Sequence, residues 1–115
     1  MTRQTYAEVL TERIFKPLGM NSSGYDTHDA LIEKRASGYV YGPDGYRNAA
    51  YLDMSLPYAA GSLYSTVEDL YRWDRSLAAG KVVSAEMQQK MFARQVKTPA
   101  PSGESHYGYG WSVRG

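Results

Sequence analysis

The residues that could do chemistry in this 115-residue sequence are its serines, histidines and carboxylates, because it contains no cysteine. Nucleophilic catalysis by a serine needs a general base held beside the hydroxyl. The sequence has neither a Ser-x-x-Lys motif nor a Gly-x-Ser-x-Gly elbow, two local patterns that signal such a serine. His28 and His106 lie in polar, turn-rich segments, which favours solvated loop residues over catalytic bases. We therefore predict no catalytic residue in this chain.

Metal and cofactor sites are not predicted either. Asp26, His28 and Asp29 crowd one segment, but their spacing matches no metal-binding signature. Gly108 and Gly110 form only a lone Gly-x-Gly, without the strand–turn–helix context of a dinucleotide site. Thirteen Lys and Arg residues against twelve Asp and Glu give a net charge of +1, so nucleic-acid binding is not expected.

Length and composition indicate a single domain, or a segment of one, over residues 1–115. No apolar run approaches the roughly 18 residues that would suggest a membrane span. The absence of cysteine is compatible with either redox compartment. Eleven Tyr residues beside two Phe residues favour half-buried surfaces such as a cleft lining or an interface, since tyrosine buries a ring but keeps a polar hydroxyl.

A first helix is predicted over about residues 5–15. Thr5 and Glu8 form a capping box, in which each side chain accepts a hydrogen bond from the other residue's backbone N–H. Pro17 and Gly19 are expected to end this helix, because proline lacks an N–H and glycine adopts a left-handed exit readily.

Two further helices follow the same logic. Ser65 and Glu68 predict a second capping box, before a helix that stops near Gly80. A third, shorter helix is predicted to begin at Ser84. Its apolar face, with Met87, Met91 and Phe92, is predicted to face the core. The helices are expected to supply most of that core, around Val9, Leu10, Ile14, Leu70, Tyr71, Trp73, Leu77, Met91 and Phe92.

The predicted strands are few, so the expected fold class is α+β and helix-dominated. Aromatic and β-branched residues on both sides of Gly42–Gly45 predict a small hairpin around a Pro-Asp-Gly turn. Residues 97–105 are expected to form an exposed connection. Large residues alternate with Gly and Ser over Tyr107–Val113, which predicts one terminal strand. Its partners are expected outside this chain, so strand pairing with a second copy is a possible route to a homodimer.

Three parts of the sequence carry a family resemblance. They are Tyr6–Leu10 with Ile14–Met20, then Ala60–Leu70 with Trp73, and finally Tyr107–Trp111. In order and rough spacing they resemble the "IF-x-PLGM", "AGGL-x-ST-x-x-DL" and "YGYGW" elements of the serine β-lactamase and penicillin-binding-protein-like superfamily. The most similar branch holds class C β-lactamases, D-alanyl-D-alanine carboxypeptidases and esterases, and its members are often bacterial periplasmic or secreted proteins.

The resemblance implies an internal segment of a larger hydrolase domain, the rest of which would be its partner. The family's Ser-x-x-Lys and Tyr-x-Asn motifs precede the "PLGM" helix, and its Lys-Thr-Gly or His-x-Gly motif follows "YGYGW". Tyr46-Arg47-Asn48 and Lys97-Thr98-Pro99 look similar to two of these motifs but fall in the wrong intervals. The implied parent reaction is acyl transfer on a β-lactam, a D-Ala peptide or an ester, and this chain alone is expected to be inactive.

The resemblance also implies where a substrate cleft would touch this chain. The family's "AGGL" loop borders the substrate groove, and Ala60, Gly61 and Ser62 resemble its first three residues. The resemblance therefore implies that these three residues, with Tyr58 just before them, form part of the cleft wall. The alternative is a plain turn before a capped helix, which needs no substrate. A second hypothesis for the whole chain is an independently folding binding or assembly module that self-associates through its tyrosine-rich surface and terminal strand.

Overall fold

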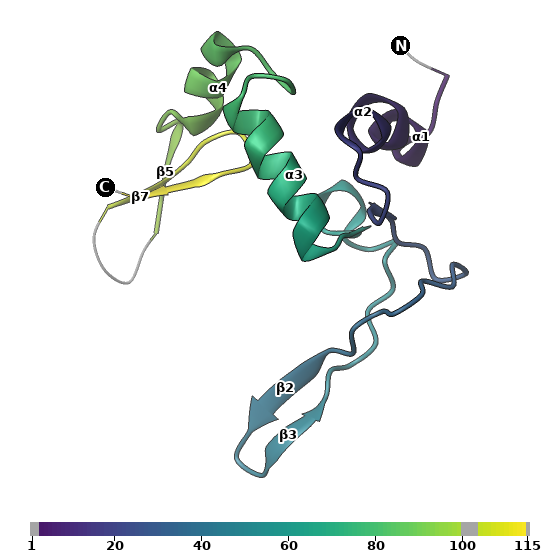
Figure 1. The fold of residues 1–115 in the computed structure, drawn as a ribbon. Coiled ribbons are helices and arrows are strands. Elements are labelled where there is room, and N and C mark those ends of the chain that lie inside the picture. Colours follow the sequence, from purple (N-terminus) through teal and green to yellow (C-terminus); the bar gives the residue numbers. More distant parts are fainter. Residues whose placement is uncertain (1–2, 100–103, 115) are drawn as a thin grey trace. The chain divides into compact units, whose positions relative to one another are not determined.

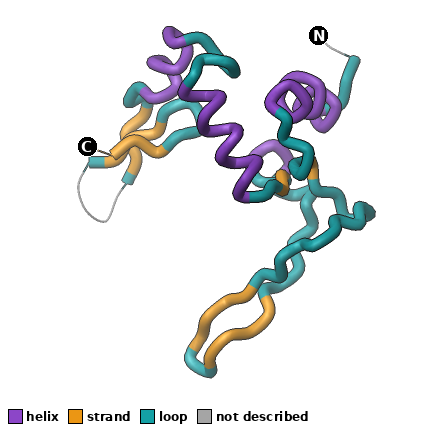
Figure 2. The backbone as a smooth tube through the Cα atoms, in the orientation of Figure 1, coloured by secondary structure: helices purple, strands orange, loops and turns teal. Residues whose placement is uncertain are grey.

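The structure, a computed structural model, describes residues 3–99 and 104–114 and confirms the α+β class (Figures 1 and 2). The chain divides into two compact units, residues 1–69 and 70–115, which are treated separately here. The helical elements are α1 (Tyr6–Leu10), a π-helical turn (Thr11–Phe15), α2 (Lys16–Leu18), a 3-10 turn (Tyr58–Ala60), α3 (Val67–Ala78) and α4 (Ala85–Phe92). The strands are β1 (Gly24–Tyr25), β2 (Tyr39–Gly42), β3 (Gly45–Asn48), β4 (Leu63–Tyr64), β5 (Val96–Thr98), β6 (Ser105–Tyr107) and β7 (Ser112–Arg114).

The first helix begins as predicted but continues through Pro17. The backbone N–H of Thr5 donates to Glu8 at 2.7 Å, and the N–H of Glu8 donates back to the Thr5 hydroxyl at 3.3 Å. Just before the proline the helix widens into a π turn, in which the Lys16 N–H reaches the Thr11 carbonyl. A proline ring clashes with the carbonyl four residues back, and a wider turn is one way to accommodate it. The prediction that Pro17 ends the helix was therefore wrong.

Gly19 ends this helix instead, with a left-handed φ of +67°. The Gly19 N–H donates to the Lys16 carbonyl at 3.1 Å, and the Met20 N–H donates to the Phe15 carbonyl at 2.8 Å. These two bonds define a Schellman motif, which satisfies carbonyls that the helix end would leave free. Phe15 and Met20 are both buried, as expected for the apolar pair that accompanies this motif.

The hairpin is confirmed. Strands β2 and β3 pair antiparallel from Tyr39 opposite Asn48 to Gly42 opposite Gly45, with Pro43 and Asp44 forming the turn. Gly45 has a φ of +99°, a backbone conformation that a side chain would disfavour.

The second and third helices are confirmed, with one change at a cap. The Asp69 N–H donates to the Thr66 hydroxyl at 3.3 Å, so the helix α3 is capped one residue later than the predicted Ser65–Glu68 box. The Ser65 hydroxyl instead lies 2.7 Å from the Ser23 hydroxyl. Ser84 caps α4 as predicted, since its hydroxyl accepts from the Met87 N–H.

The C-terminal segment corrects the prediction of a lone strand. Residues 107–113 divide into the end of β6, a turn, and β7, and the three strands β5, β6 and β7 form an antiparallel sheet in that order. The Gly108 N–H donates to the Trp111 carbonyl at 2.8 Å, which closes the turn. The alternation of Gly with large residues was misread as one strand because glycine serves equally well in a tight turn. Part of the predicted connection, Val96–Thr98, is strand β5; residues 100–103 lie outside the described residues.

Burial within the described residues is lower than the predicted core requires. The buried hydrophobic residues of this described part are Phe15, Met20 and Leu77. Of the predicted core, only Leu77 is fully buried, and Met87 is 47% exposed. The exposed members of the predicted core are Leu70, Tyr71 and Phe92. Among the described residues no helix is long and apolar enough to cross a membrane.

Candidate functional site

The predicted site residues lie on a compact turn in the first unit. Tyr58–Ala60 form a single 3-10 turn that begins after Pro57. The Ala60 N–H donates to the Pro57 carbonyl at 2.8 Å, and the Ser62 N–H donates to the Tyr58 carbonyl at 3.0 Å. Strand β4 and then helix α3 follow directly, so the turn is fixed at both ends.

Ser62 fixes the end of this turn through hydrogen bonds. Its side chain is fully buried, and its hydroxyl donates to the Met54 carbonyl. Its own carbonyl accepts from the Asp26 N–H at 2.8 Å, next to the paired strands β1 and β4. A hydroxyl that donates to a backbone carbonyl has no general base to activate it, so Ser62 is built as an anchor and not as a nucleophile.

The other predicted site residues face solvent. Tyr58 is 54% exposed, and Ala60 and Gly61 are exposed as well. Tyr58 adopts a φ of +43°, which is uncommon for a residue other than glycine and indicates strain that the surroundings maintain. Its ring lies 5.3 Å from that of Tyr6 and 6.2 Å from that of Tyr25, and the Tyr6 and Tyr25 rings meet edge to face at 5.8 Å. The three tyrosine rings thus pack together on one side of the turn.

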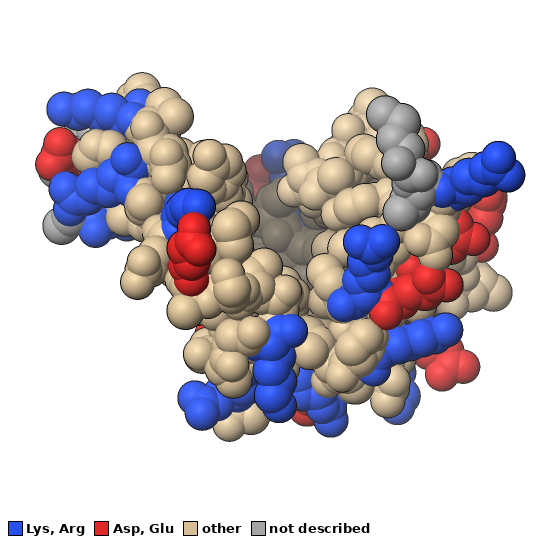
Figure 3. Space-filling model, turned by 90° about the horizontal axis from the view of Figure 1, so that it is seen from above, with Lys and Arg blue, Asp and Glu red and all other residues tan. Residues whose placement is uncertain are grey.

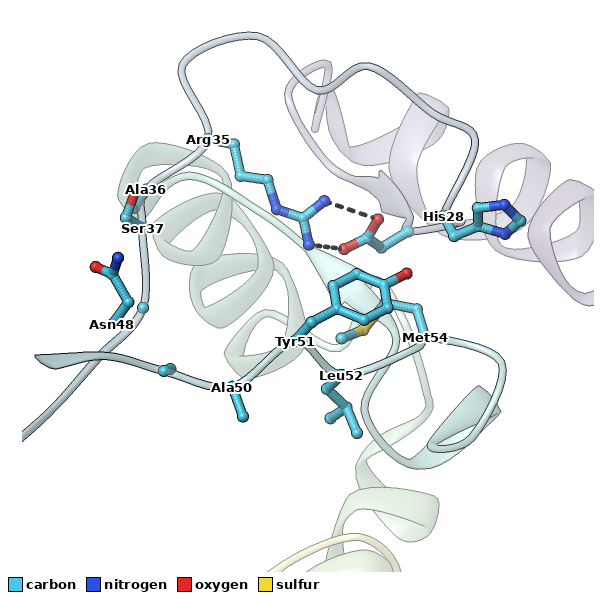
Figure 4. A pocket seen from close by; sticks show the side chains of 12 residues that line it. His28, Arg35, Ala36, Ser37, Asn48, Ala50, Tyr51, Leu52 and Met54 are labelled. Atoms are coloured by element: carbon cyan, nitrogen blue, oxygen red, sulfur yellow. Dashed lines mark hydrogen bonds and ion pairs between the residues drawn. The ribbon is translucent and has the colours of Figure 1, made fainter.

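An ion pair with a buried carboxylate, which the sequence interpretation did not find, lies next to the same turn, because the Asp26 N–H donates to the Ser62 carbonyl. The Arg35 guanidinium donates to both carboxylate oxygens of Asp26, and the Asp26 side chain is only 6% exposed (Figure 4). The pair borders a cavity of about 540 Å³ that reaches Tyr51 and Met54. In the sequence, Asp26 was one of several carboxylates in a turn-rich segment, and only the fold reveals which cation it meets.

A second buried carboxylate ties strand β1 to helix α3. Asp69 is 1% exposed and accepts hydrogen bonds from the Ser22 N–H and the Ser23 hydroxyl, both at 2.8 Å. The Ser23 hydroxyl in turn meets that of Ser65. Asp69 also lies in the first turn of α3, where a carboxylate complements the positive helix end, but these hydrogen bonds give its side chain a specific structural role.

Neither histidine is part of the turn at Tyr58–Ala60. His28 is exposed, and its Nε2 lies 3.0 Å from the Asp29 carboxylate. His106 lies on the central strand β6, with Nε2 3.8 Å from Glu104. Among the described residues, no three His, Asp or Glu side chains converge as metal ligands.

The motif-like triplets and the surface charge add no site. Tyr46-Arg47-Asn48 lies within strand β3, and Lys97-Thr98 lies within β5. On the face shown in Figure 3, Lys and Arg side chains and Asp and Glu side chains are both present among uncharged surface.

Comparison with known proteins defines the class to which this fold belongs. A family model described as Beta-lactamase matches residues 1–115. The chain is 31% identical over 110 residues to the putative penicillin-binding protein PbpX of Bacillus subtilis, a match that covers 96% of this chain and 26% of that protein. This chain therefore belongs to the β-lactamase family.

Solved structures agree with that assignment. The penicillin-binding protein from Bacillus halodurans superposes with a TM-score of 0.74 at 27% identity, over 96% of this chain and 34% of that one. The D-amino acid amidase from Ochrobactrum anthropi SV3 gives a TM-score of 0.76 at 30% identity, over 95% of this chain and 33% of the amidase. The chain thus spans about a quarter of the curated relative and a third of each of these structures.

Proposed function

We propose that this chain supplies scaffold and part of the substrate-cleft wall to a larger serine hydrolase, which acts by acyl transfer on a β-lactam, a D-Ala peptide or an ester. In such an enzyme the serine attacks the carbonyl and backbone N–H groups hold the oxyanion. The catalytic groups lie outside this chain, which is inert alone. The observation that carries the proposal is the match of the Beta-lactamase model to residues 1–115 without a Ser-x-x-Lys motif among them.

The construction of the turn supports a role in a cleft wall. The side chain of Ser62 is buried, while Tyr58, Ala60 and Gly61 are exposed to solvent. A wall needs a rigid backbone with accessible side chains, and the buried anchor, the tyrosine cluster and the left-handed backbone of Tyr58 provide that combination.

The exposed apolar side chains support a role as part of a larger domain. Helix α3 exposes Val67, Leu70 and Tyr71, each by more than half of its surface. Apolar groups spaced three or four residues apart on a helix form one stripe, which is normally covered by another element. We infer that the remainder of the hydrolase domain covers this stripe.

An activity measurement on the 115-residue chain tests the proposal. No turnover of nitrocefin or of a p-nitrophenyl ester is expected, and mass spectrometry after incubation with penicillin should show the unmodified mass. A covalent penicillin adduct, or turnover that persists in the Ser62→Ala variant, would overturn the inert assignment. The parent class is tested in the same way on the reading frame extended in both directions, where turnover that depends on a Ser-x-x-Lys serine is expected.

The alternative of a self-associating module is favoured by one observation. Tyr39, Tyr41 and Tyr46 are exposed on the two-stranded hairpin, whose outer edges have no partner strand within the described residues. The terminal strand β7 is paired with β6 along one edge, so it offers only its other edge, which has no partner strand among the described residues. Light scattering across micromolar concentrations separates the two: a monomer contradicts the module, and a defined dimer favours it.

A further inference from the structure

The cavity beside the Asp26–Arg35 pair has the features of a small-molecule site. It encloses about 540 Å³, which is within the range of ordinary ligand pockets. All of its lining lies in the first unit, on the segment before β2, at the last residue of β3 and on the segment after β3. It is distinct from the exposed face of the turn at residues 58–61, none of which lines it.

Arg35 is held in place for recognition of an acceptor group. A guanidinium has five N–H donors in a planar fork, and Asp26 receives one from each terminal nitrogen. Among the described residues no other group accepts a hydrogen bond from this side chain, which is 51% exposed. Three donors thus remain available on a guanidinium whose position is fixed by a buried carboxylate, and planar acceptors such as carboxylates match that fork.

The rest of the lining combines donors with an apolar wall. Asn48 and Ser37 lie on one side of the cavity in Figure 4, and the Tyr51 ring lies beneath the guanidinium. Leu52 and Met54 continue that wall. The carboxylate on the lining is that of Asp26, and it is paired with Arg35. No unpaired anion on the lining would repel a bound carboxylate.

We propose that this cavity binds a small molecule in which a carboxylate lies next to an aromatic or aliphatic group. The carboxylate accepts hydrogen bonds from the outward N–H groups of Arg35, with Ser37 and Asn48 as further donors. The apolar group packs on Tyr51 and its neighbours. Asp26 acts through Arg35 as a positioning residue. The site does not depend on acyl transfer, so it stands or falls separately from the function proposed above.

Titration of the ¹⁵N-labelled chain, followed by amide NMR, tests the proposal with hippurate as the probe. Its neutral counterpart, hippuramide, has the same ring and backbone without the charge. Hippurate should shift the amides of residues 35–38 and 48–52 in a saturable manner, and hippuramide should bind about tenfold more weakly, because it lacks a charge-assisted hydrogen bond. Equal affinities would overturn the assignment of Arg35. Shifts confined to residues 31–33 and 63–66, which line a second cavity of about 700 Å³ that Arg35 also borders, would overturn the assignment of the site.

Variants separate the two halves of the site. Arg35→Gln should abolish the preference for hippurate, whereas Arg47→Gln, on strand β3 and outside the lining, should leave it unchanged. Tyr51→Ala should weaken both probes by a similar factor of about three to ten. Because Tyr51 is 78% exposed, this variant should fold even if Arg35→Gln does not, and unchanged binding by it would overturn the apolar half of the proposal.

Discussion

Each of the two units of this chain contains one junction between its elements, and the two junctions are built in opposite ways. In the first unit, buried polar groups do the work: Asp26, Ser62 and Asp69 are each at most 5% exposed, and each makes hydrogen bonds to residues distant in sequence. In the second unit, the turn at Gly108 packs directly against the end of helix α4, where a Cβ on Gly108 would lie 2.2 Å from the Met91 carbonyl oxygen. The first junction depends on polar side chains that form hydrogen bonds, and the second depends on the absence of a Cβ atom at Gly108.

This difference determines which kind of substitution destabilises each junction. Removing a side chain from the polar junction leaves unsatisfied donors or acceptors but creates no clash. Adding a single methyl group at Gly108 forces two backbone segments apart. The polar junction is therefore sensitive to deletion, and the glycine junction to addition.

The largest effect is expected for Gly108→Ala. Its Cβ would also lie 3.1 Å from the Ala93 carbonyl oxygen, and the shift needed would strain the 3.0 Å bond from the Tyr109 N–H to the Met91 carbonyl. We expect a loss of about 3 kcal/mol in the free energy of unfolding, measured by urea denaturation. Gly42→Ala is the matched control, because nothing lies within 4 Å of its Cβ position. Equal losses in the two variants would contradict the close approach.

Asp69→Ala should follow, with a loss of about 2 to 3 kcal/mol. The substitution removes the buried carboxylate that accepts from the Ser22 N–H and the Ser23 hydroxyl, in a partly buried place. Asp74→Ala, at an exposed position of the same helix, provides the control and should cost far less. A double-mutant cycle with Ser23→Ala measures the bond itself, and strict additivity would show that the two side chains are not coupled.

Ser62→Ala should cost less, about 1 to 2 kcal/mol, because it removes one donor from the Met54 carbonyl and keeps the backbone bond to Asp26. Ser112→Ala, at an exposed position of strand β7, is the control and should change the free energy of unfolding by less than about 0.5 kcal/mol. If Ser62→Ala were neutral, the buried hydroxyl could not be the anchor of the turn.

The same contrast explains what the sequence could predict. Local rules were sufficient for the capping box at Thr5, the Pro-Asp-Gly turn and the cap at Ser84, because each depends on residues within four positions of one another. They failed where long-range contacts decide. Strands β1 and β4 have only two residues each, and their pairing joins residues about forty positions apart.

The candidate site was likewise predictable only in its local part. The turn at Tyr58–Ser62 was found through a family resemblance, but not its internal order, in which one residue is buried and the others are exposed. The Asp26–Arg35 pair had no sequence signal, because a carboxylate and a guanidinium nine residues apart meet only when the intervening loop folds back. Gly108 was assigned to a terminal strand, whereas it lies in a turn against the backbone of Met91 and Ala93.

The smallest effect concerns a surface cap, which tests whether exposed hydrogen bonds matter as buried ones do. The Thr5 N–H and, to a lesser degree, the Thr5 hydroxyl hold the pKa of the Glu8 carboxyl below its ordinary value. A carboxyl whose pKa is lower in the folded state stabilises the fold above its unfolded pKa, and that contribution disappears as the pH falls through the folded value. The helix start should therefore fray selectively in acid, with faster amide exchange at residues 6–9. Carboxyl NMR should give Glu8 a lower pKa in the folded chain than in urea. Since Thr5→Pro removes the main donor, it should raise the folded pKa more than Thr5→Val, which removes only the hydroxyl; the reverse order would contradict the assigned cause.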